Sequence, residues 1–344
     1  MRTDLLVVGG GAMGSATAWW AARAGRDVTL LERHPGHHVH GSSHGRSRIF
    51  RLAYADGSYV AMAREAYDLW RLLERESGAS LLQVTGGVDH GVAVDDIEAN
   101  LRAHGLPYER LAAAAAAERW PALRFSSDVV HQPDAGRLDA DAAVETLHAE
   151  AARHGADVRF GVTAVAARET SYGVAVTTDT GDEYEARVAV VAAGAWLPGL
   201  LASLPVPDDL PPFRVTQEQP VYLPSDAAWP SWIHHRADGV PYYGLGAPGE
   251  GVKVGEHGSG RPVTPDARLG VDAAAVRRVE EYAAEWLPGA EPRATRADSC
   301  LYTTTPDESF VLRRHGALVV CSPCSGHGFK FVPAIGRRTA ALSG

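Results

Sequence analysis

The chain has few cysteines, a deficit of positive charge and no long apolar run. Its 344 residues contain three cysteines, Cys300, Cys321 and Cys324. An odd, low number argues against a disulfide framework and is typical of a reducing compartment. No signal peptide is visible and no run of about 18 or more apolar residues occurs, so we expect a cytoplasmic protein with no membrane-spanning helix.

The charge balance excludes one class of partner. The formal net charge is -9 at pH 7, whereas binding to a phosphate backbone needs a basic face, so no nucleic-acid partner is expected. Hydrophobic residues make up 45% and charged residues 22% of the chain, as in ordinary globular proteins. The length predicts two domains or two interleaved lobes around a large core.

The first 32 residues have the pattern of a strand, a glycine-rich turn, a helix and a second strand. Leu5–Val8 is wholly apolar, as expected of a strand buried on both faces, and Val28–Leu31 repeats the pattern before Glu32. Residues 9–14 read GGGAMG and match the dinucleotide-binding fingerprint G-x-G-x-x-G. The segment therefore predicts a βαβ unit that binds a dinucleotide.

Each element of this fingerprint has its own physical reason. Gly9 permits the tight turn, Gly11 lets the backbone approach a pyrophosphate, and Gly14 lets the helix pack closely on the strand. The N-terminus of the helix supplies unpaired N–H groups for the phosphates. Glu32 can accept hydrogen bonds from both ribose hydroxyls and disfavours the 2′-phosphate of NADP. FAD and NAD remain as candidate cofactors, and the choice between them depends on motifs later in the chain.

Further along the chain, helical and strand-like segments alternate. A hairpin is predicted from 174–178 and 183–187, followed by a separate buried strand within 188–196. Proline clusters near 205–212 and 224–230 introduce a segment rich in strand formers. Helices are predicted at 59–76, at 112–117, at 140–154 with Asp139 as the N-cap, and at 273–286.

Three distant segments carry a resemblance to a known family. They are residues 41–51 (GSSHGRSRIFR), 300–308 (CLYTTTPDE) and 325–331 (SGHGFKF). Together with the glycine fingerprint they resemble the monomeric sarcosine oxidase and N-methyltryptophan oxidase family of the D-amino acid oxidase/glycine oxidase superfamily. The resemblance runs from residue 3 to about residue 340, so it implies FAD as the cofactor and a monomeric enzyme.

The resemblance also implies the fold. The expected class is α/β (α+β overall), with a Rossmann-like FAD-binding domain and an interleaved antiparallel-sheet substrate domain. The FAD-binding domain is expected to comprise residues 1–80, 140–204 and 296–344, and the substrate-binding domain residues 81–139 and 205–295.

The family motifs imply a set of cofactor contacts. Cys300 matches the cysteine that carries FAD through an 8α-S-cysteinyl bond, which would raise the flavin potential. The alternative is a buried, inert cysteine, the common state of a free thiol. His44 matches a histidine implicated in flavin attachment. The predicted cofactor-binding residues are Gly9, Gly11, Gly14, Glu32, Arg33, Ser42, His44, Cys300, Gly326, Gly328 and Lys330.

A second set matches the reaction centre of the family. Arg51 and Lys330 match the clamp on the substrate carboxylate, because a guanidinium binds a carboxylate bidentately and an ammonium adds a point charge. Lys253 matches the lysine that activates oxygen over the flavin. The alternative for the clamp is a surface salt bridge, and Lys253 or His257 taken alone would more often be an ordinary strand residue. The other matches are Arg48 on the other flavin face, His257 beside the substrate amine, and Tyr243 and Tyr302 flanking the substrate.

The activity implied is oxidation of an N-methyl (secondary) amino acid such as sarcosine. The clamped substrate gives a hydride from its C–H bond to the flavin, the imine is hydrolysed to an aldehyde and an amine, and O2 becomes H2O2. One alternative is a flavin tailoring oxidase or dehydrogenase acting on a cyclic or larger secondary amine, such as a proline or pipecolate derivative. A second is a non-catalytic FAD-binding protein.

Two features depart from the simplest form of this pattern. Glu256 precedes His257 at a position where relatives tend to be aromatic or uncharged, so it would either favour a cationic or larger substrate or face solvent. Cys321 and Cys324 form a C-x-x-C pair without the strand-to-helix context of a thioredoxin. We expect them to be two small residues in a packed turn, with a disulfide as the alternative.

Overall fold

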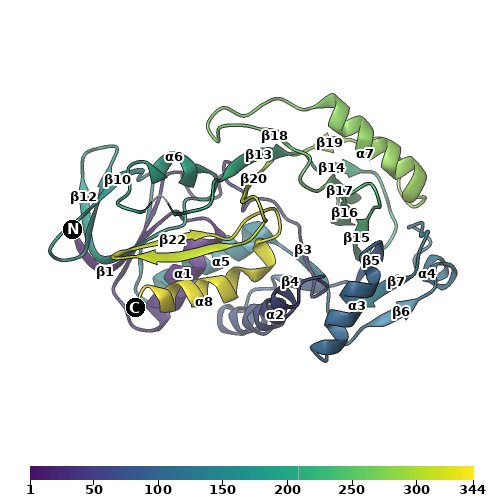
Figure 1. The fold of residues 1–344 in the computed structure, drawn as a ribbon, viewed down its shortest axis with the longest axis horizontal. Helices are drawn as coiled ribbons and strands as arrows, with labels where there is room; N and C mark the ends of the chain where they lie inside the picture. The colour runs from purple at the N-terminus through teal and green to yellow at the C-terminus, as the bar shows by residue number, and fades with distance from the viewer. Residues whose placement is uncertain (208) are drawn as a thin grey trace.

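The computed structural model describes residues 1–207 and 209–344. It has the mixed α/β fold expected from the sequence, with two large sheets at opposite ends of an elongated molecule (Figure 1). Both chain termini lie at the end formed by the first sheet. Among the described residues, no helix is long and apolar enough to cross a membrane.

The first large sheet is built on the predicted strand–helix–strand unit. The strand β1 (Arg2–Val8) pairs in parallel with β2 (Val28–Glu32) on one side and with β12 (Glu183–Val191) on the other. The order is β10-β11-β12-β1-β2-β9, with β22 beside β12 and β21 beside β22. The remaining strands are β9 (Asp157–Phe160), β10 (Ala164–Glu169), β11 (Val174–Thr178), β21 (Val311–His315) and β22 (Leu318–Ser322).

The predicted break within residues 183–196 is wrong. β12 is one continuous strand, and it ends at Val191 rather than at Gly194, which instead opens the short 3₁₀ helix η1 (Gly194–Trp196). The two halves of β12 have different neighbours on one side. Glu183 to Ala186 pair with β11, whereas Ala189 to Val191 pair with β22. The change from a polar alternating pattern to an apolar run therefore marks a change of neighbour within one strand.

Three helices, α1 (Ala12–Arg23), α5 (Ala140–Arg153) and α8 (Val332–Leu342), pack on one face of this sheet, and a fourth, α2 (Gly57–Ser77), packs against α8 in the same buried cluster. Small residues allow a close approach of α1 and α8, since a Cβ at Gly336 would lie 2.5 Å from the Cβ of Ala16. In α5 the carboxylate of Asp139 accepts from the N–H of Ala142, so the predicted N-cap is confirmed.

The helix α2 confirms the amphipathic pattern read at 59–76. Its apolar face, with Ala63, Ala66, Leu69, Trp70 and Leu73, is buried. The helix begins at an Asp56 cap and ends at Gly78, whose φ of 74° suits the left-handed cap conformation. The indole Nε1 of Trp70 donates to the backbone carbonyl of Lys330 over 2.8 Å. This contact ties α2 to the C-terminal motif.

The second large sheet is antiparallel except for one pair, and its order is β19-β14-β17-β16-β15-β5-β7-β6. The helices α7 (Ala273–Trp286), as predicted, and α4 (Ala113–Arg119) share a buried cluster with one face of it. Its strands are β5 (Gly87–Gly91), β6 (Glu109–Leu111), β7 (Val129–Gln132), β14 (Val221–Leu223), β15 (Ser231–His235), β16 (Tyr242–Gly246), β17 (Val252–Glu256) and β19 (Arg296–Ala297).

Two small sheets complete the fold. One has the order β3-β8-β4 and the other β18-β13-β20. Their strands are β3 (Arg48–Phe50), β4 (Leu82–Val84), β8 (Gly136–Leu138), β13 (Arg214–Glu218), β18 (Arg261–Pro262) and β20 (Cys300–Thr304), and the remaining helices are α3 (Val94–Ala103), α6 (Leu197–Leu201) and η2 (Phe329–Phe331). The predicted division into two discontinuous domains stays a prediction.

Candidate active site

A cavity of about 1010 Å³ opens at the carboxyl ends of β1, β2 and β12. Ligands of parallel α/β sheets bind at this edge of the sheet. The cavity runs from the glycine turn to the start of β20 and the C-terminal motif, so segments far apart in the sequence share it. Its lining includes Gly9, Gly11, Glu32, Arg33, Ser42, His44, Arg48, Cys300, Tyr302, Gly326 and Gly328.

The glycine turn leaves room on its cavity side only. Gly9 has a φ of +105°, and a Cβ there would lie 2.4 Å from the carbonyl oxygen of Ala192. A Cβ at Gly14 would lie 1.9 Å from the carbonyl oxygen of Gly9, so the helix packs directly on the turn. At Gly11 a Cβ would meet only the hydroxyl of Ser43, at 3.4 Å. The turn thus presents backbone to the cavity at the helix N-terminus, where a pyrophosphate is favoured.

Glu32 is buried at the end of β2 beside this turn. Its two carboxylate oxygens accept from the backbone N–H groups of Gly10 (2.7 Å) and His34 (2.8 Å). Burial acts to raise the pKa of Glu32, but the hydrogen bond from His38 and those from the backbone outweigh it, and the pKa is lowered. Glu32 is therefore a fixed anion, and a carboxylate has further lone pairs for a ribose hydroxyl.

The loop 41–51 and the start of β20 meet at the other end of the cavity. The hydroxyl of Ser42 donates to the backbone carbonyl of Leu301 over 2.6 Å, which joins the two segments. Arg48 donates to the backbone carbonyls of Ser42 and Ser47, at 3.1 and 2.9 Å, and its Nη2 is 3.9 Å from the sulfur of Cys300. The thiol of Cys300 lies beside a fixed guanidinium in the cavity wall.

Two polar atoms of the cavity lining favour a polar occupant. His44 Nε2 and Ser322 Oγ are buried and have no hydrogen-bond partner among the described residues. An unpaired buried polar atom is costly, so a ligand with hydrogen-bonding groups along the cavity would satisfy both. Burial and the nearby Arg48 lower the pKa of His44 to about 4, so its ring is neutral. The glycine turn, Glu32 and these unpaired atoms fit an elongated dinucleotide such as FAD.

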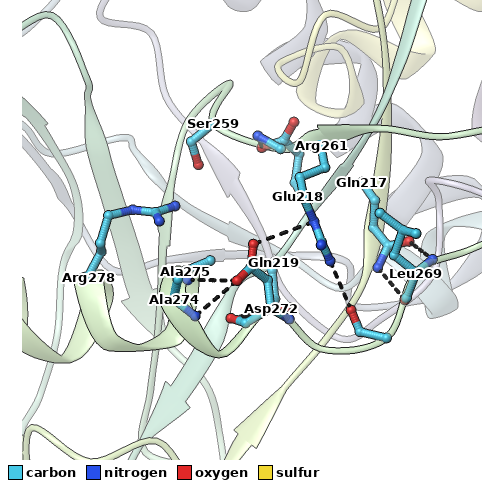
Figure 2. Close-up of polar contacts among 12 residues, drawn as sticks. Gln217, Glu218, Gln219, Ser259, Arg261, Leu269, Asp272, Ala274, Ala275 and Arg278 are labelled. Carbon is cyan, nitrogen blue, oxygen red and sulfur yellow. Dashed lines mark hydrogen bonds and ion pairs between the residues drawn. The ribbon is translucent and has the colours of Figure 1, made fainter.

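A loop of residues 263–272 borders the cavity, and two glutamines hold it in place. The side chain of Gln217 exchanges two hydrogen bonds with the backbone of Leu269, at 2.8 and 2.9 Å. Gln219 does the same with Asp272, at 3.0 and 2.7 Å (Figure 2). Residues 263–266 of this loop line the cavity, so β13 positions one of its walls.

The second sheet turns a different set of side chains toward this end of the cavity. In β17 the valines at 252 and 254 pack under α7, so Lys253 between them faces the other way. Its Nζ is 3.5 Å from the carbonyl oxygen of Ser47, next to Arg48. Burial, followed by the charge of Arg48, lowers the pKa of Lys253 to about 7.

Arg51 and Lys330 come together from opposite ends of the sequence. The Cζ of Arg51 is 4.1 Å, and the Nζ of Lys330 5.5 Å, from the ring centre of Tyr54. Lys330 is 6% exposed, and its ammonium donates to the carbonyl of His327 over 2.7 Å. Burial, followed by the charge of Arg51, lowers the pKa of Lys330. The pair brings two basic side chains together, and the one carboxylate that the described residues place against it is Asp89, 3.4 Å from Arg51.

The other predicted residues surround this pair with neutral groups. Burial, then Arg51 and Lys330, lower the pKa of His257 to about 4, and His257 lies 5.5 Å from Tyr302 between ring centres. Burial raises the pKa of both Tyr243 and Tyr302. A Cβ at Gly255 would lie 2.7 Å from the hydroxyl of Tyr243. These rings form an aromatic wall that contributes no charge.

Not all predicted residues line the same cavity. Gly14 lies behind the glycine turn, and five residues of the reaction centre lie next to the cavity rather than in its wall. Two of them, Lys253 and Lys330, are buried, and the other three are partly buried. Arg48 and Tyr302 line the cavity, and Tyr302 faces His257. The five are Arg51, Tyr243, Lys253, His257 and Lys330.

Neither expectation for Glu256 is correct. Its side chain is on the face of β17 that packs under α7, opposite Lys253, and it is 8% exposed. Its carboxylate accepts two hydrogen bonds from Nε and one from Nη2 of Arg278, together with one from Tyr242 at 2.8 Å. The alternation of a strand explains the difference: a residue directly before His257 has to point away from it.

All three cysteines are free thiols, which excludes the disulfide alternative for the C-x-x-C pair in this structure. Cys321 is buried in the core beside the hydroxyl of Thr339, and burial raises its pKa to about 12. Cys324 accepts from the N–H of Thr303 over 3.3 Å. Cys321 is therefore a core residue of β22 rather than of a turn, and only Cys324 lies in the turn between β22 and the C-terminal motif.

Several residues of the site were missed by the sequence analysis. Tyr54 is buried against the Arg51–Lys330 pair, and the partly buried His327 accepts a hydrogen bond from Lys330 through its backbone carbonyl. Asp89 is paired with both Arg51 and His235. One compositional signal was available: the chain has only two lysines, Lys253 and Lys330, and the structure buries both at this site.

Comparisons with known proteins agree with this geometry. The profile of the family described as FAD dependent oxidoreductase (DAO) matches residues 4–342. The N-methyl-L-tryptophan oxidase of Yersinia pestis (strain Pestoides F) is 31% identical over 100% of this chain and 95% of its own length. The structure is similar to the open form of NikD, an unusual amino acid oxidase essential for nikkomycin biosynthesis, with a TM-score of 0.86, 30% identity, and coverage of 99% of this chain and 94% of that one. The L-proline dehydrogenase from P. horikoshii has the same fold at 21% identity, with a TM-score of 0.86 and coverage of 99% and 93% of the two chains.

Proposed function

Because the chain belongs to the DAO family of FAD-dependent oxidoreductases, we propose that it oxidises an N-methyl (secondary) amino acid, of which sarcosine is the simplest, with O2 as the electron acceptor. The products would be an aldehyde, an amine and H2O2. The enzyme is of the amino acid oxidase type, and the identity of its substrate is the part that we propose.

The observation that carries the proposal is the pair of basic side chains beside the cofactor cavity. Arg51 and Lys330 face the same aromatic ring, and among the described residues only Arg51 has a carboxylate near it, that of Asp89. A guanidinium and an ammonium in such a place would bind a carboxylate strongly and fix its orientation. The neutral His257 next to them can accept a proton from the substrate amine, which has to lose its charge before its C–H bond reacts.

FAD would be held by the chain at both ends of the cavity. The glycine turn and Glu32 would hold the pyrophosphate and ribose, and Ser42, His44, Arg48 and Cys300 surround the opposite end. When bound, FAD supplies the two-electron acceptor that the side chains lack. The position of Cys300 in the cavity wall beside Arg48 supports covalent attachment, because its sulfur is accessible to a cofactor in the cavity.

Lys253 is proposed to serve the oxygen reaction. Its ammonium is buried and, within the part of the chain that the structure describes, has one hydrogen-bond contact, to the carbonyl of Ser47. Its charge is therefore available to stabilise a developing negative charge. The three free cysteines agree with a reducing compartment such as the cytoplasm.

A tailoring oxidase acting on a cyclic or larger secondary amine is the second candidate. The structural similarity to NikD, described as an unusual amino acid oxidase, supports this second candidate. A non-catalytic FAD-binding protein agrees less well with the geometry, since burying Arg51, Lys253 and Lys330 together is costly without a ligand that uses them.

An anaerobic titration of the purified flavoprotein distinguishes these candidates. Sarcosine, N-methyltryptophan and L-proline are added separately and the visible flavin band is followed. Bleaching by sarcosine or N-methyltryptophan supports the N-methyl amino acid oxidase. Bleaching by L-proline alone favours the second candidate. A flavin that no amine reduces contradicts the proposed activity.

A further inference from the structure

A buried carboxylate that the proposed chemistry does not use lies next to the carboxylate-binding pair. Asp89, in β5, is 2% exposed. Its Oδ1 is 3.4 Å from Nη1 of Arg51 and 2.9 Å from Nε2 of His235. Its Oδ2 accepts from the side-chain amide of Gln132 over 3.4 Å. A charged group in such a place requires a functional or structural reason, because burial of a carboxylate is costly.

The strand register puts Asp89 on the face of the second sheet that is directed toward the cofactor cavity. Asp89 is opposite Ile233 in β15, Ile233 is opposite Tyr243 in β16, and Tyr243 is opposite Gly255 in β17. Lys253 is two residues before Gly255 and shares its face. Asp89 and Lys253 are therefore part of one surface, the one that meets the cofactor cavity rather than the core under α7.

Arg51 is held along one edge of its guanidinium. Its Nη1 donates to the backbone carbonyl of Ala53 and faces Asp89, whereas Nη2 has no acceptor among the described residues. Gln132 fixes this arrangement from behind, because its amide oxygen accepts from the N–H of Leu52 (2.8 Å) while its amide nitrogen contacts Asp89. The free edge is the one that a substrate carboxylate could bind.

We propose that Asp89 is the positioning and specificity residue of the carboxylate site. It fixes the Nη1 edge of Arg51, and its own negative charge weakens the site for ligands that bring only a carboxylate. An amino acid that brings a carboxylate and a positively charged amine is not opposed in this way. The inference rests on the proposed role of Arg51 in the substrate site, and it predicts that the enzyme discriminates amino acids from plain carboxylic acids.

The physical reason is that Asp89 and a ligand carboxylate are both negatively charged and repel each other. A ligand carboxylate on the free edge of Arg51 lies within a few ångströms of Asp89, and two anions in a poorly solvated site repel each other strongly. A zwitterion has an ammonium group that compensates for this repulsion. Asp89 thus orients Arg51 while it raises the free energy of a complex with a simple anion.

Two substitutions separate orientation from charge. Asp89→Asn keeps an oxygen that can accept from Arg51 and His235 but removes the charge, whereas Asp89→Ala removes both. The probe is phenylacetate, a carboxylate with no amine to oxidise, and its dissociation constant for the FAD-loaded protein is measured by calorimetry. We expect the affinity to rise about tenfold in Asp89→Asn and to fall about tenfold in Asp89→Ala, with 1.4 kcal/mol for each tenfold change.

A matched control removes one negative charge elsewhere. Asp96→Asn, at an exposed position of α3, changes the net charge equally and should leave the dissociation constant unchanged. Adding Arg51→Met to Asp89→Asn should abolish the gain in affinity. If Asp89→Ala does not fold, the sign of the change in Asp89→Asn decides the matter alone.

The outcomes overturn the proposal in distinct ways. Weaker or unchanged binding of phenylacetate in Asp89→Asn would mean that the charge of Asp89 has no role in selectivity. A gain that survives the loss of Arg51 would refute the link between the two residues. An enzyme that oxidises none of the N-methyl amino acids but has the expected changes in phenylacetate binding would disprove the proposed function and leave the role of Asp89 intact.

Discussion

Lys253 lies directly opposite Tyr222 in the β14–β17 pair, and its Nζ is 5.7 Å from the centre of the tyrosine ring. The hydroxyl of Tyr222 donates to Asp298 over 2.9 Å, and the Cζ of Arg296 is 3.9 Å from the same ring. The negative face of an aromatic ring favours a cation. Lys253 therefore sits between the charge of Arg48, which lowers its pKa, and that of Asp298, which raises it.

The first prediction concerns the pH dependence of the oxygen reaction. With a pKa of about 7, Lys253 is cationic below pH 7 and loses its charge as the pH rises through that value. The reoxidation rate of the reduced flavin should therefore fall above pH 7. Lys253→Met should slow reoxidation by ~10²-fold and make it independent of pH in this range. Stopped-flow mixing with O2 measures this rate, and anaerobic reduction by the substrate serves as the control. Equal losses in the two half-reactions would contradict a specific role in the oxygen step.

The second prediction is that Asp298→Asn shifts this profile to lower pH. Removing the anion behind Tyr222 removes a negative charge that raises the pKa of Lys253, so the ammonium should lose its proton at a lower pH. Because the chain has only two lysines, selective ¹³Cε-lysine labelling gives two signals from internal residues, which Lys330→Met assigns. Titration of the Lys253 signal measures its pKa without turnover. Asp182→Asn, in an exposed hairpin turn, is the control, and a Lys253 signal that titrates identically in Asp298→Asn would exclude this coupling.

The third prediction concerns flavin attachment. Cys300 lines the cavity beside Arg48, whereas Cys324 is bound to the N–H of Thr303. Cys300→Ser should therefore release the flavin as free FAD when the protein is precipitated with acid, whereas Cys324→Ser should retain it. Absorbance of the supernatant and of the redissolved pellet measures how much flavin is free and how much stays attached to the protein. Free FAD from the unmodified protein would show that the link does not form.

The fourth prediction tests the packing of the glycine turn. A Cβ at Gly14 would lie 1.9 Å from the carbonyl oxygen of Gly9, so Gly14→Ala has to separate α1 from the turn or distort it. We expect loss of most of the bound FAD and a lower thermal midpoint, because the cost of overpacking is about 1–3 kcal/mol. Gly270→Ala is the matched control, since a Cβ there meets nothing within 4 Å. Flavin content per protein and thermal unfolding measure both variants.

The βαβ unit and the helices α2, α5 and α7 could be predicted because each is encoded locally. The glycine turn has its spacing, α2 has its periodic apolar face, and Asp139 is a cap immediately before its helix. Asp89 and His235 could not be predicted, since their contact depends on the parallel pairing of β5 with β15, which no local pattern specifies. The family motifs placed Arg51 and Lys330 in one site, but the neighbours that tune them come from strands of the second sheet.

The last prediction concerns Glu256, which is next to His257 in the sequence but points to the opposite face of the sheet. Its carboxylate is paired with Arg278 and Tyr242 under α7 and does not face the substrate. Glu256→Gln should therefore leave the preference among amine substrates unchanged. It should cost about 1–3 kcal/mol of folding free energy, the typical cost of a lost hydrogen bond to a charged group. The control is Glu281→Gln, at an exposed position of α7, which should change neither the substrate preference nor the folding free energy.

The pH dependence of this stabilisation has a definite sign. Burial acts to raise the pKa of Glu256, but the hydrogen bonds from Arg278, Tyr242 and Ser259 outweigh it, so the folded pKa is lowered. A lowered pKa contributes stability that is complete above the unfolded value and is lost as the pH falls through the folded value. The difference in unfolding free energy between the wild-type protein and Glu256→Gln should thus be largest near neutral pH and shrink in acid. Denaturant titrations from neutral to acidic pH measure it, and a difference that grows in acid, or a changed substrate preference, would refute this placement of Glu256.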